Sequence, residues 1–106
     1  MDACEKSVKH DPWVRERGLF GYFDELVSEV EEVRDALGDS EHLKEELGDV
    51  LMDWVHVCLL AGVPIDEVIS GVTDKLNRRK PYLSEARTVT KDEAVRLWQK
   101  AKRAER

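Results

Sequence analysis

Apolar residues recur at three- and four-residue steps along most of the chain, and no segment shows the apolar–polar alternation of a half-buried strand. The first helical pattern begins between Leu19 and Tyr22 and ends near Leu37. Its apolar positions are Phe23, Leu26, Val27, Val30, Val33 and Leu37. Gly38 is suited to end this helix, and Ser40 is suited to cap the start of the next one. The pattern therefore predicts two helices joined by a short turn.

The second helix is expected to cover residues 40–61, and it carries an unusual combination of side chains. Over residues 50–61, apolar side chains point in nearly every direction, and a helix with this pattern is normally buried. Asp49, Asp53 and His56 nevertheless lie in or beside this run at helical spacing. Because unpaired buried charge is very costly, we expect these groups to be paired, protonated or bound to a metal.

Two further helices are predicted toward the C-terminus. The third has Pro64 in its first turn, where proline is tolerated, and ends near Arg79, before Pro81. The last helix is short and follows Thr90, which has Glu93 three residues later, the spacing of a capping box. With helices and no strand, the predicted fold class is all-α.

Length and composition indicate one small domain. The chain has 106 residues; residues 1–11 are expected to be frayed, and residues 83–106 to form a C-terminal linker and short helix. The net charge of −6 argues against a general nucleic-acid or membrane binder. The two cysteines form no disulfide framework, and Cys58 is interpreted as a small core residue. No signal peptide is visible and residues 50–60 are too few to span a bilayer, so we expect a cytoplasmic protein.

The helices present wider apolar faces than one small chain can cover. We therefore predict a homo-oligomer, either a dimer whose paired helices complete a four-helix bundle or a dimer of dimers. Four aromatic residues are expected to pack in the core, and each is also a candidate surface for stacking on a substrate. They are Trp13, Phe20, Phe23 and Trp54.

The first two helices each carry a pair of acidic residues at a three-residue spacing. Glu29 and Glu32 form the first pair, and Glu46 and Asp49 form the second. Residues three apart share one helix face, so an antiparallel arrangement would bring the four carboxylates together. Ligands that are all carboxylates favour Mg²⁺ or Mn²⁺ over zinc. The alternative interpretation is a solvated acidic stripe on a helical bundle.

A basic segment closes the third helix. Lys75, Asn77, Arg78 and Arg79 could contact phosphate, because arginine offers forked donors, lysine a point charge and asparagine an amide. Lys75 and Arg79 lie four residues apart, so we expect these two to share the inward face. The alternative is that the cations only complement the helix dipole.

These motifs resemble the MazG-like nucleoside triphosphate pyrophosphohydrolases of the all-α NTP pyrophosphatase superfamily. The family signature is Glu-x-x-Glu, a spacer and Glu-x-x-Asp; here thirteen residues separate Glu32 from Glu46. Pro12-Trp13, the Lys-Leu-x-Arg-Arg-x-Pro string at 75–81 and Trp98 are similar to the family as well. Ser28 departs from it, because many members have an acid there. Asn77 looks more like the single-domain dCTP pyrophosphatases, so the preferred nucleotide stays open.

The resemblance implies hydrolysis of a nucleoside triphosphate to the monophosphate and pyrophosphate, in a nucleotide-pool house-cleaning role. It implies Mg²⁺, with Mn²⁺ as a substitute, held by Glu29, Glu32, Glu46 and Asp49. Glu32 or Glu46 would take the proton of the attacking water. Asp53 would be a further ligand or a residue that supports the ligands. The substrate contacts implied are Lys75, Asn77, Arg78, Arg79 and Trp13.

Two other interpretations compete with this one. The chain could be a non-catalytic helical module that dimerises or senses nucleotides. Alternatively, Asp53-x-x-His56 resembles half of a carboxylate-bridged di-iron site. Against the di-iron site, the two acidic pairs bring no second histidine, and the basic segment would have no purpose. His56 itself is expected to be a hydrogen-bonded core histidine.

Overall fold

The computed structural model describes residues 2–105, which cluster into two compact units with the boundary between Ile65 and Asp66. The elements in chain order are α1 (Asp2–His10), α2 (Pro12–Ala36), α3 (Ser40–Ala61), α4 (Ile65–Arg79), the 3₁₀ helix η1 (Pro81–Leu83) and α5 (Lys91–Ala104). Residues 2–105 contain no strand, which confirms the all-α class. Within residues 2–105, no single helix is long and apolar enough to cross a membrane, although α3 and α4 taken together pass the same test of length and composition.

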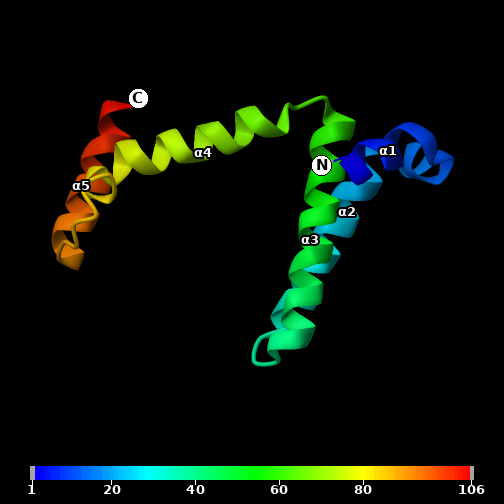
Figure 1. Ribbon diagram of the computed structural model, residues 1–106, viewed down its shortest axis with the longest axis horizontal. Coiled ribbons are helices and arrows are strands. Elements are labelled where there is room, and N and C mark those ends of the chain that lie inside the picture. Colours follow the sequence, from blue (N-terminus) through cyan, green and yellow to red (C-terminus); the bar gives the residue numbers. More distant parts are fainter. Residues whose placement is uncertain (1, 106) are drawn as a thin grey trace. The chain divides into compact units, whose positions relative to one another are not determined.

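In the first unit, α2 and α3 form an antiparallel hairpin (Figure 1). The turn between them uses Gly38, whose φ of +104° is accessible to glycine at little cost. The N-cap of α3 is Asp39, and not Ser40 as the sequence predicted, because the Asp39 carboxylate accepts a hydrogen bond from the His42 amide at 3.3 Å. Gly62, in the left-handed conformation, ends the helix.

Helix α2 contains a break at Gly18, which has a φ of +68° and a ψ of −172°. The segment after the break begins at the predicted position, while residues 12–17 form an additional helical segment before it. Asp11 caps this early segment by accepting a hydrogen bond from the Trp13 amide, and Pro12 occupies the first turn. The break therefore changes the direction of the chain between Trp13 and the rest of α2.

Residues 2–10 form helix α1, where the sequence predicted a frayed segment. Helix α1 packs mainly against α3 and buries the side chain of Cys4. Its C-terminal carbonyl groups at Val8 and Lys9 accept hydrogen bonds from the guanidinium of Arg15 on α2. The sequence did not predict this helix because it has no broad apolar face. The helix is held in place by one buried cysteine and by the hydrogen bonds at its C-terminal end.

The core of the first unit lies where α1, α2 and α3 meet. Val14 and Val55 are its most deeply buried large side chains, and Cys58 is buried as predicted. The expectation that α3 is buried on all sides does not hold within one chain, because Leu51 is 48% exposed. Phe20 and Phe23, also expected in the core, are 82% and 51% exposed. Within residues 2–105, these side chains are therefore about half exposed or more.

In the second unit, η1 and the following loop connect α4 to α5. Tyr82 in η1 is buried, whereas no residue of α4 or α5 is fully buried. Thr90 caps α5 by accepting a hydrogen bond from the Glu93 amide at 3.2 Å, which confirms the predicted cap. This unit therefore depends on polar and aromatic side-chain contacts more than on an apolar core.

We expect Val55→Ala to lower the free energy of unfolding by about 2 kcal/mol, because it removes two methyl groups from a site that is 1% exposed. Chemical denaturation followed by circular dichroism measures the loss. Val63→Ala is the matched control, since Val63 is 42% exposed. Equal effects of the two substitutions would contradict this description of the core.

Candidate metal centre

The hairpin of α2 and α3 brings three of the four predicted acidic ligands together. Glu29 on α2 faces Glu46 and Asp49 on α3, and one carboxylate oxygen from each lies within 4.8 Å of the others. All three side chains are partly buried. Glu32 is exposed and belongs to neither group of converging carboxylates found in residues 2–105. The antiparallel pairing that the sequence predicted therefore accounts for a three-carboxylate group.

A second group shares Glu29 with the first. Oxygen atoms of Glu25, Glu29 and Asp53 also lie within 4.8 Å of one another. The sequence had marked Asp53, one turn after Asp49, but it had not marked Glu25. The missed signal was helical spacing, because Glu25 lies four residues before Glu29 on the same face of α2.

Burial and like charge raise the pKa of two of these carboxyl groups. Loss of solvent raises the pKa of Glu29 above its usual 4.5, and the charges of Asp49, Asp53 and Glu46 raise it further. Loss of solvent likewise raises the pKa of Asp53 above 3.8, with a further contribution from Glu25. The folded hairpin thus holds both groups in an environment that disfavours their negative charge.

One arginine offsets part of this charge. The Nη2 atom of Arg17 lies 2.8 Å from Oε1 of Glu25, in a partly buried ion pair. The same guanidinium lies 4.9 Å from the ring centroid of Trp13, and its Nε atom is buried with no hydrogen-bond acceptor. Trp13 is 56% exposed, so it packs against Arg17 and not in the core, where the sequence had placed it.

The residues of the two groups fit a hard divalent cation. Every donor is a carboxylate oxygen, which Mg²⁺ and Mn²⁺ prefer, and neither group contains histidine or cysteine. Asp53 is only 4% exposed, and within residues 2–105 its carboxylate accepts no hydrogen bond. A buried carboxylate of this kind is costly unless a cation or a proton neutralises it.

His56 is a hydrogen-bonded core histidine, as predicted. Its Nδ1–H donates to the Met52 carbonyl at 2.8 Å, so in the neutral ring Nε2 accepts the hydroxyl hydrogen of Ser7 at 2.9 Å. The ring also stacks on Tyr22, with centroids 4.8 Å apart. With both nitrogens engaged, His56 is not positioned as a metal ligand, which weighs against a di-iron site with Asp53.

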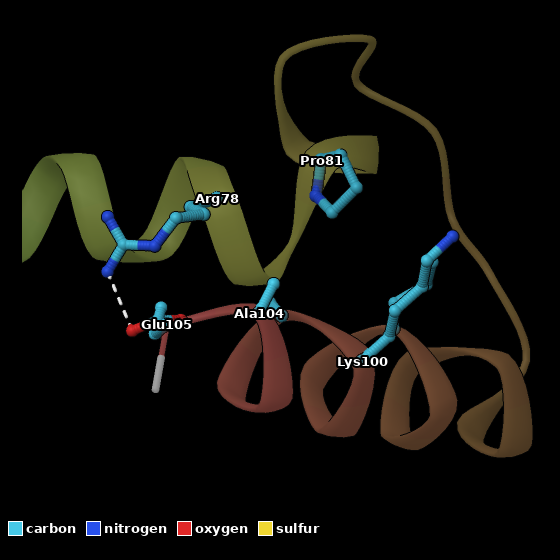
Figure 2. A pocket seen from close by; sticks show the side chains of 7 residues that line it. Arg78, Pro81, Lys100, Ala104 and Glu105 are labelled. Carbon is cyan, nitrogen blue, oxygen red and sulfur yellow. Dashed lines mark hydrogen bonds and ion pairs between the residues drawn. The ribbon is translucent and has the colours of Figure 1, made fainter.

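In the second unit, the basic segment forms a cluster with a carboxylate and an aromatic ring. Figure 2 shows the contact between Arg78 and Glu105. Glu105 accepts hydrogen bonds from Arg78 at 2.9 Å and from Arg79 at 3.2 Å. The guanidinium of Arg79 also lies 4.6 Å from the ring centroid of Trp98. The neighbouring residues Arg78 and Arg79 therefore share Glu105 as their hydrogen-bond acceptor. The sequence had predicted Lys75 and Arg79 as the inward pair, but Lys75 is exposed, as is Asn77.

Beside this cluster lies a cavity of about 300 Å³ between α4 and α5. Arg78 and Lys100 border it together with Glu105, as Figure 2 shows, and Leu97 lines its apolar side. The cavity thus combines two cationic side chains with one carboxylate. A phosphate group at this position would compete with Glu105 for the Arg78 guanidinium, because both are anions that accept paired hydrogen bonds.

Comparison with known proteins gives consistent matches. Residues 21–84 match the MazG nucleotide pyrophosphohydrolase domain. The chain is 30% identical over 103 residues to a nucleoside triphosphate pyrophosphohydrolase of Mycolicibacterium smegmatis, and 28% identical over 102 residues to one of Escherichia coli K12. Its structure resembles the crystal structure of a MazG-related protein from Thermotoga maritima, with a TM-score of 0.87 and 29% identity, over 96% of this chain and 95% of that one.

The curated relatives are much longer than the matched segment. Each alignment covers 90% of this chain, but only 32% of the M. smegmatis protein and 39% of the E. coli protein. A third relative, the uncharacterised protein YabN of Bacillus subtilis, is 29% identical over 105 residues, which cover 21% of its length. The match therefore concerns one domain of each relative.

We expect the carboxyl group of Glu105 to titrate with a pKa of about 2, below its usual 4.5, because Arg78 and then Arg79 donate hydrogen bonds to its ionised form. Since the pKa is lowered in the folded state, the stabilisation by this contact is complete above pH 4.5 and is lost as the pH falls toward 2. A ¹³C NMR titration of the side-chain carboxyl measures it. Arg78→Gln should raise the midpoint; an unchanged midpoint would show that the contact is absent in solution.

Proposed function

We propose, from the premise that this chain belongs to the MazG nucleotide pyrophosphohydrolase family, that it hydrolyses nucleoside triphosphates to the monophosphate and pyrophosphate. The observation that supports this most directly is the convergence of Glu29, Glu46 and Asp49 between two antiparallel helices. These are three of the four acids in the family signature. A house-cleaning role in the nucleotide pool is part of the proposal.

The three converging carboxylates would hold Mg²⁺, with Mn²⁺ as a substitute. When bound there, the metal ion would supply Lewis-acid stabilisation of the phosphate charge and would lower the pKa of the attacking water. Glu46 is oriented by His42, whose Nε2 lies 3.1 Å from its Oε1. Glu32 lies outside the converging groups and keeps its lone pairs, so we assign it, rather than Glu46, as the acceptor of the water's proton.

From the family resemblance of the basic segment, we propose that the cations of the second unit bind phosphate. Arg78 and Arg79 offer adjacent guanidinium groups, and Glu105 already binds both in the way that a phosphate oxygen pair would. Lys75 and Asn77 are exposed on the same helix and are available for additional contacts. Trp13, packed on Arg17 and 56% exposed, is the candidate surface for the nucleobase.

We further propose that the first unit forms a homodimer through its exposed apolar residues. On α2, four half-exposed or exposed apolar residues recur at steps of three and four, and α3 adds two more. They are Phe20, Phe23, Val27, Val30, Leu47 and Leu51. An apolar stripe of this length is typical of an interaction surface. A second copy would complete the four-helix bundle by covering the stripe with the same residues.

The reaction is tested by incubating a panel of ribo- and deoxynucleoside triphosphates with the protein, in Mg²⁺ or in a chelator, in H₂¹⁸O. We expect Mg²⁺-dependent pyrophosphate release with the label in the monophosphate, which reports attack at the α-phosphorus. Release of single phosphate would overturn the mechanism. No turnover by folded, metal-binding protein would favour the non-catalytic nucleotide-sensing module.

We expect Asp49→Asn to lower kcat/KM by at least about 100-fold, because even residues that only support metal ligands contribute 10- to 100-fold to metal affinity or activity. Steady-state kinetics across a Mg²⁺ titration measures the effect. Glu31→Gln is the matched control, since Glu31 is an exposed acid of α2 that forms an ion pair with Arg34. Wild-type turnover by Asp49→Asn at saturating Mg²⁺ would exclude Asp49 from the site.

We expect the wild-type chain to sediment at twice its chain mass, and Leu51→Glu to shift it to the monomer, because the substitution places a charge in the proposed apolar interface. Val95→Glu, at a position that is 50% exposed against 48% for Leu51, is the control and should leave the mass unchanged. A monomeric wild type at high protein concentration would contradict the proposed dimer.

A further inference from the structure

We propose that Arg17 binds the phosphate chain of the substrate, beside the three carboxylates that the proposed function assigns to the metal ion. The proposal rests on the proposed function only in taking a nucleoside triphosphate as the ligand. Arg17 lies outside both acidic motifs and outside the basic segment of α4, four residues after Trp13. Its contacts with Trp13 and Glu25 place a permanent positive charge in the first unit, next to the acidic groups.

The local backbone restrains the Arg17 side chain. Gly18, with a φ of +68°, breaks α2 directly after Arg17. The side chain lies over Gly21, where an added Cβ atom would be 3.1 Å from the Cβ of Arg17 and 3.7 Å from its Nε. The absence of a side chain at position 21 therefore gives Arg17 room, while the Trp13 ring packs against its guanidinium. An arginine restrained in this way loses less conformational entropy when it binds a ligand.

The Arg17 guanidinium has a donor that the described residues leave unused. Its Nη2 donates to Oε1 of Glu25 at 2.8 Å and to the Gly21 carbonyl at 3.4 Å, whereas the buried Nε has no acceptor within residues 2–105. Stacking on Trp13 engages the flat face of the guanidinium and leaves its edge for anions. The side chain is 31% exposed, so a phosphate oxygen can reach the guanidinium. A turn of the guanidinium toward that oxygen would give Nε an acceptor.

The charge of the acidic groups calls for a cation in the first unit. Three ionised carboxylates outweigh one divalent ion, so the loaded site would stay negative and would repel a phosphate chain. Among the described residues of the first unit, Arg17 is the one arginine or lysine in an ion pair with the two acidic groups, and its partner Glu25 lies within 4.8 Å of Glu29. His42 beside Glu46 is half exposed and carries charge only when protonated. Arg17 is therefore the group best placed to offset this repulsion.

The test measures binding of the Mg²⁺ complex of inorganic tripolyphosphate, which has a phosphate chain and no base, to the intact protein by isothermal titration calorimetry. We expect Arg17→Gln to weaken the affinity about 10-fold or more, because a charge-assisted hydrogen bond to phosphate is lost. Arg17→Lys keeps the charge without the forked donors, so its loss should be intermediate. Arg34→Gln is the matched control, since Arg34 is an exposed arginine of α2 that pairs with Glu31, and it should bind as the wild type does.

Gly21→Ala tests the position of Arg17 without removing its charge. The added Cβ requires the Arg17 side chain to shift, because a separation of 3.1 Å between the two Cβ atoms is too short. Alanine also favours the helix over glycine, so circular dichroism should show no loss of helix. We expect weaker binding of tripolyphosphate by this folded variant, a result that a role of Arg17 in folding alone would not produce.

An affinity for tripolyphosphate that is unchanged in Arg17→Gln would overturn the inference. An equal loss in Arg34→Gln would overturn it as well, because it would reflect only the net charge, and so would a wild type that binds no tripolyphosphate. If Arg17→Gln does not fold, Gly21→Ala decides the question. Binding that depends on Arg17 without turnover of any nucleoside triphosphate would refute only the proposed function, whereas turnover together with unchanged binding in Arg17→Gln would refute this inference alone.

Discussion

The close approach of like charges across the α2–α3 interface is the constraint on which the candidate site depends. Helix α2 packs against α3, and this packing brings Glu29 close to Asp49 and Asp53. The raised pKa values of Glu29 and Asp53 record the cost of this approach. A cation bound between the two helices, as proposed, would offset this cost.

In the second unit, concentrated positive charge is neutralised by a carboxylate of the same unit. There the cations Arg78 and Arg79 have a carboxylate partner, Glu105, whose pKa is lowered to about 2. The pairing keeps the arginine side chains ordered, and stacking of Arg79 on Trp98 adds to this order. A phosphate bound at these arginines would have to replace Glu105, so its affinity would reflect the difference between the two anions as partners of Arg78 and Arg79.

Exposure of apolar side chains links the fold to assembly. A sequence pattern can show that Phe23 or Leu51 is apolar, but it cannot show whether the covering surface comes from the same chain. In one chain these residues remain about half exposed. The proposed dimer would cover these apolar side chains. The expectation of a fully buried α3 was wrong for the isolated chain because α3 has no such cover there.

The sequence by itself determined the four helical segments after Gly18, their approximate ends and three of the converging acids. Periodicity and capping residues are local properties, and spacing of three or four residues fixes which side chains share a helix face. These rules were sufficient for Glu29, Glu46 and Asp49, and for the Thr90 cap.

Only the tertiary structure decided which other residues join each cluster. Glu25 joins the acidic groups and Glu32 does not, because the register and rotation of α2 against α3 are set by packing that no single-helix pattern contains. Arg78, and not Lys75, shares a carboxylate with Arg79, because α5 brings Glu105 to the end of α4. Helix α1 likewise depends on a surface formed by distant residues. A helical pattern predicts which residues share one face of a helix. The packing of a second element against that face determines which residues they contact.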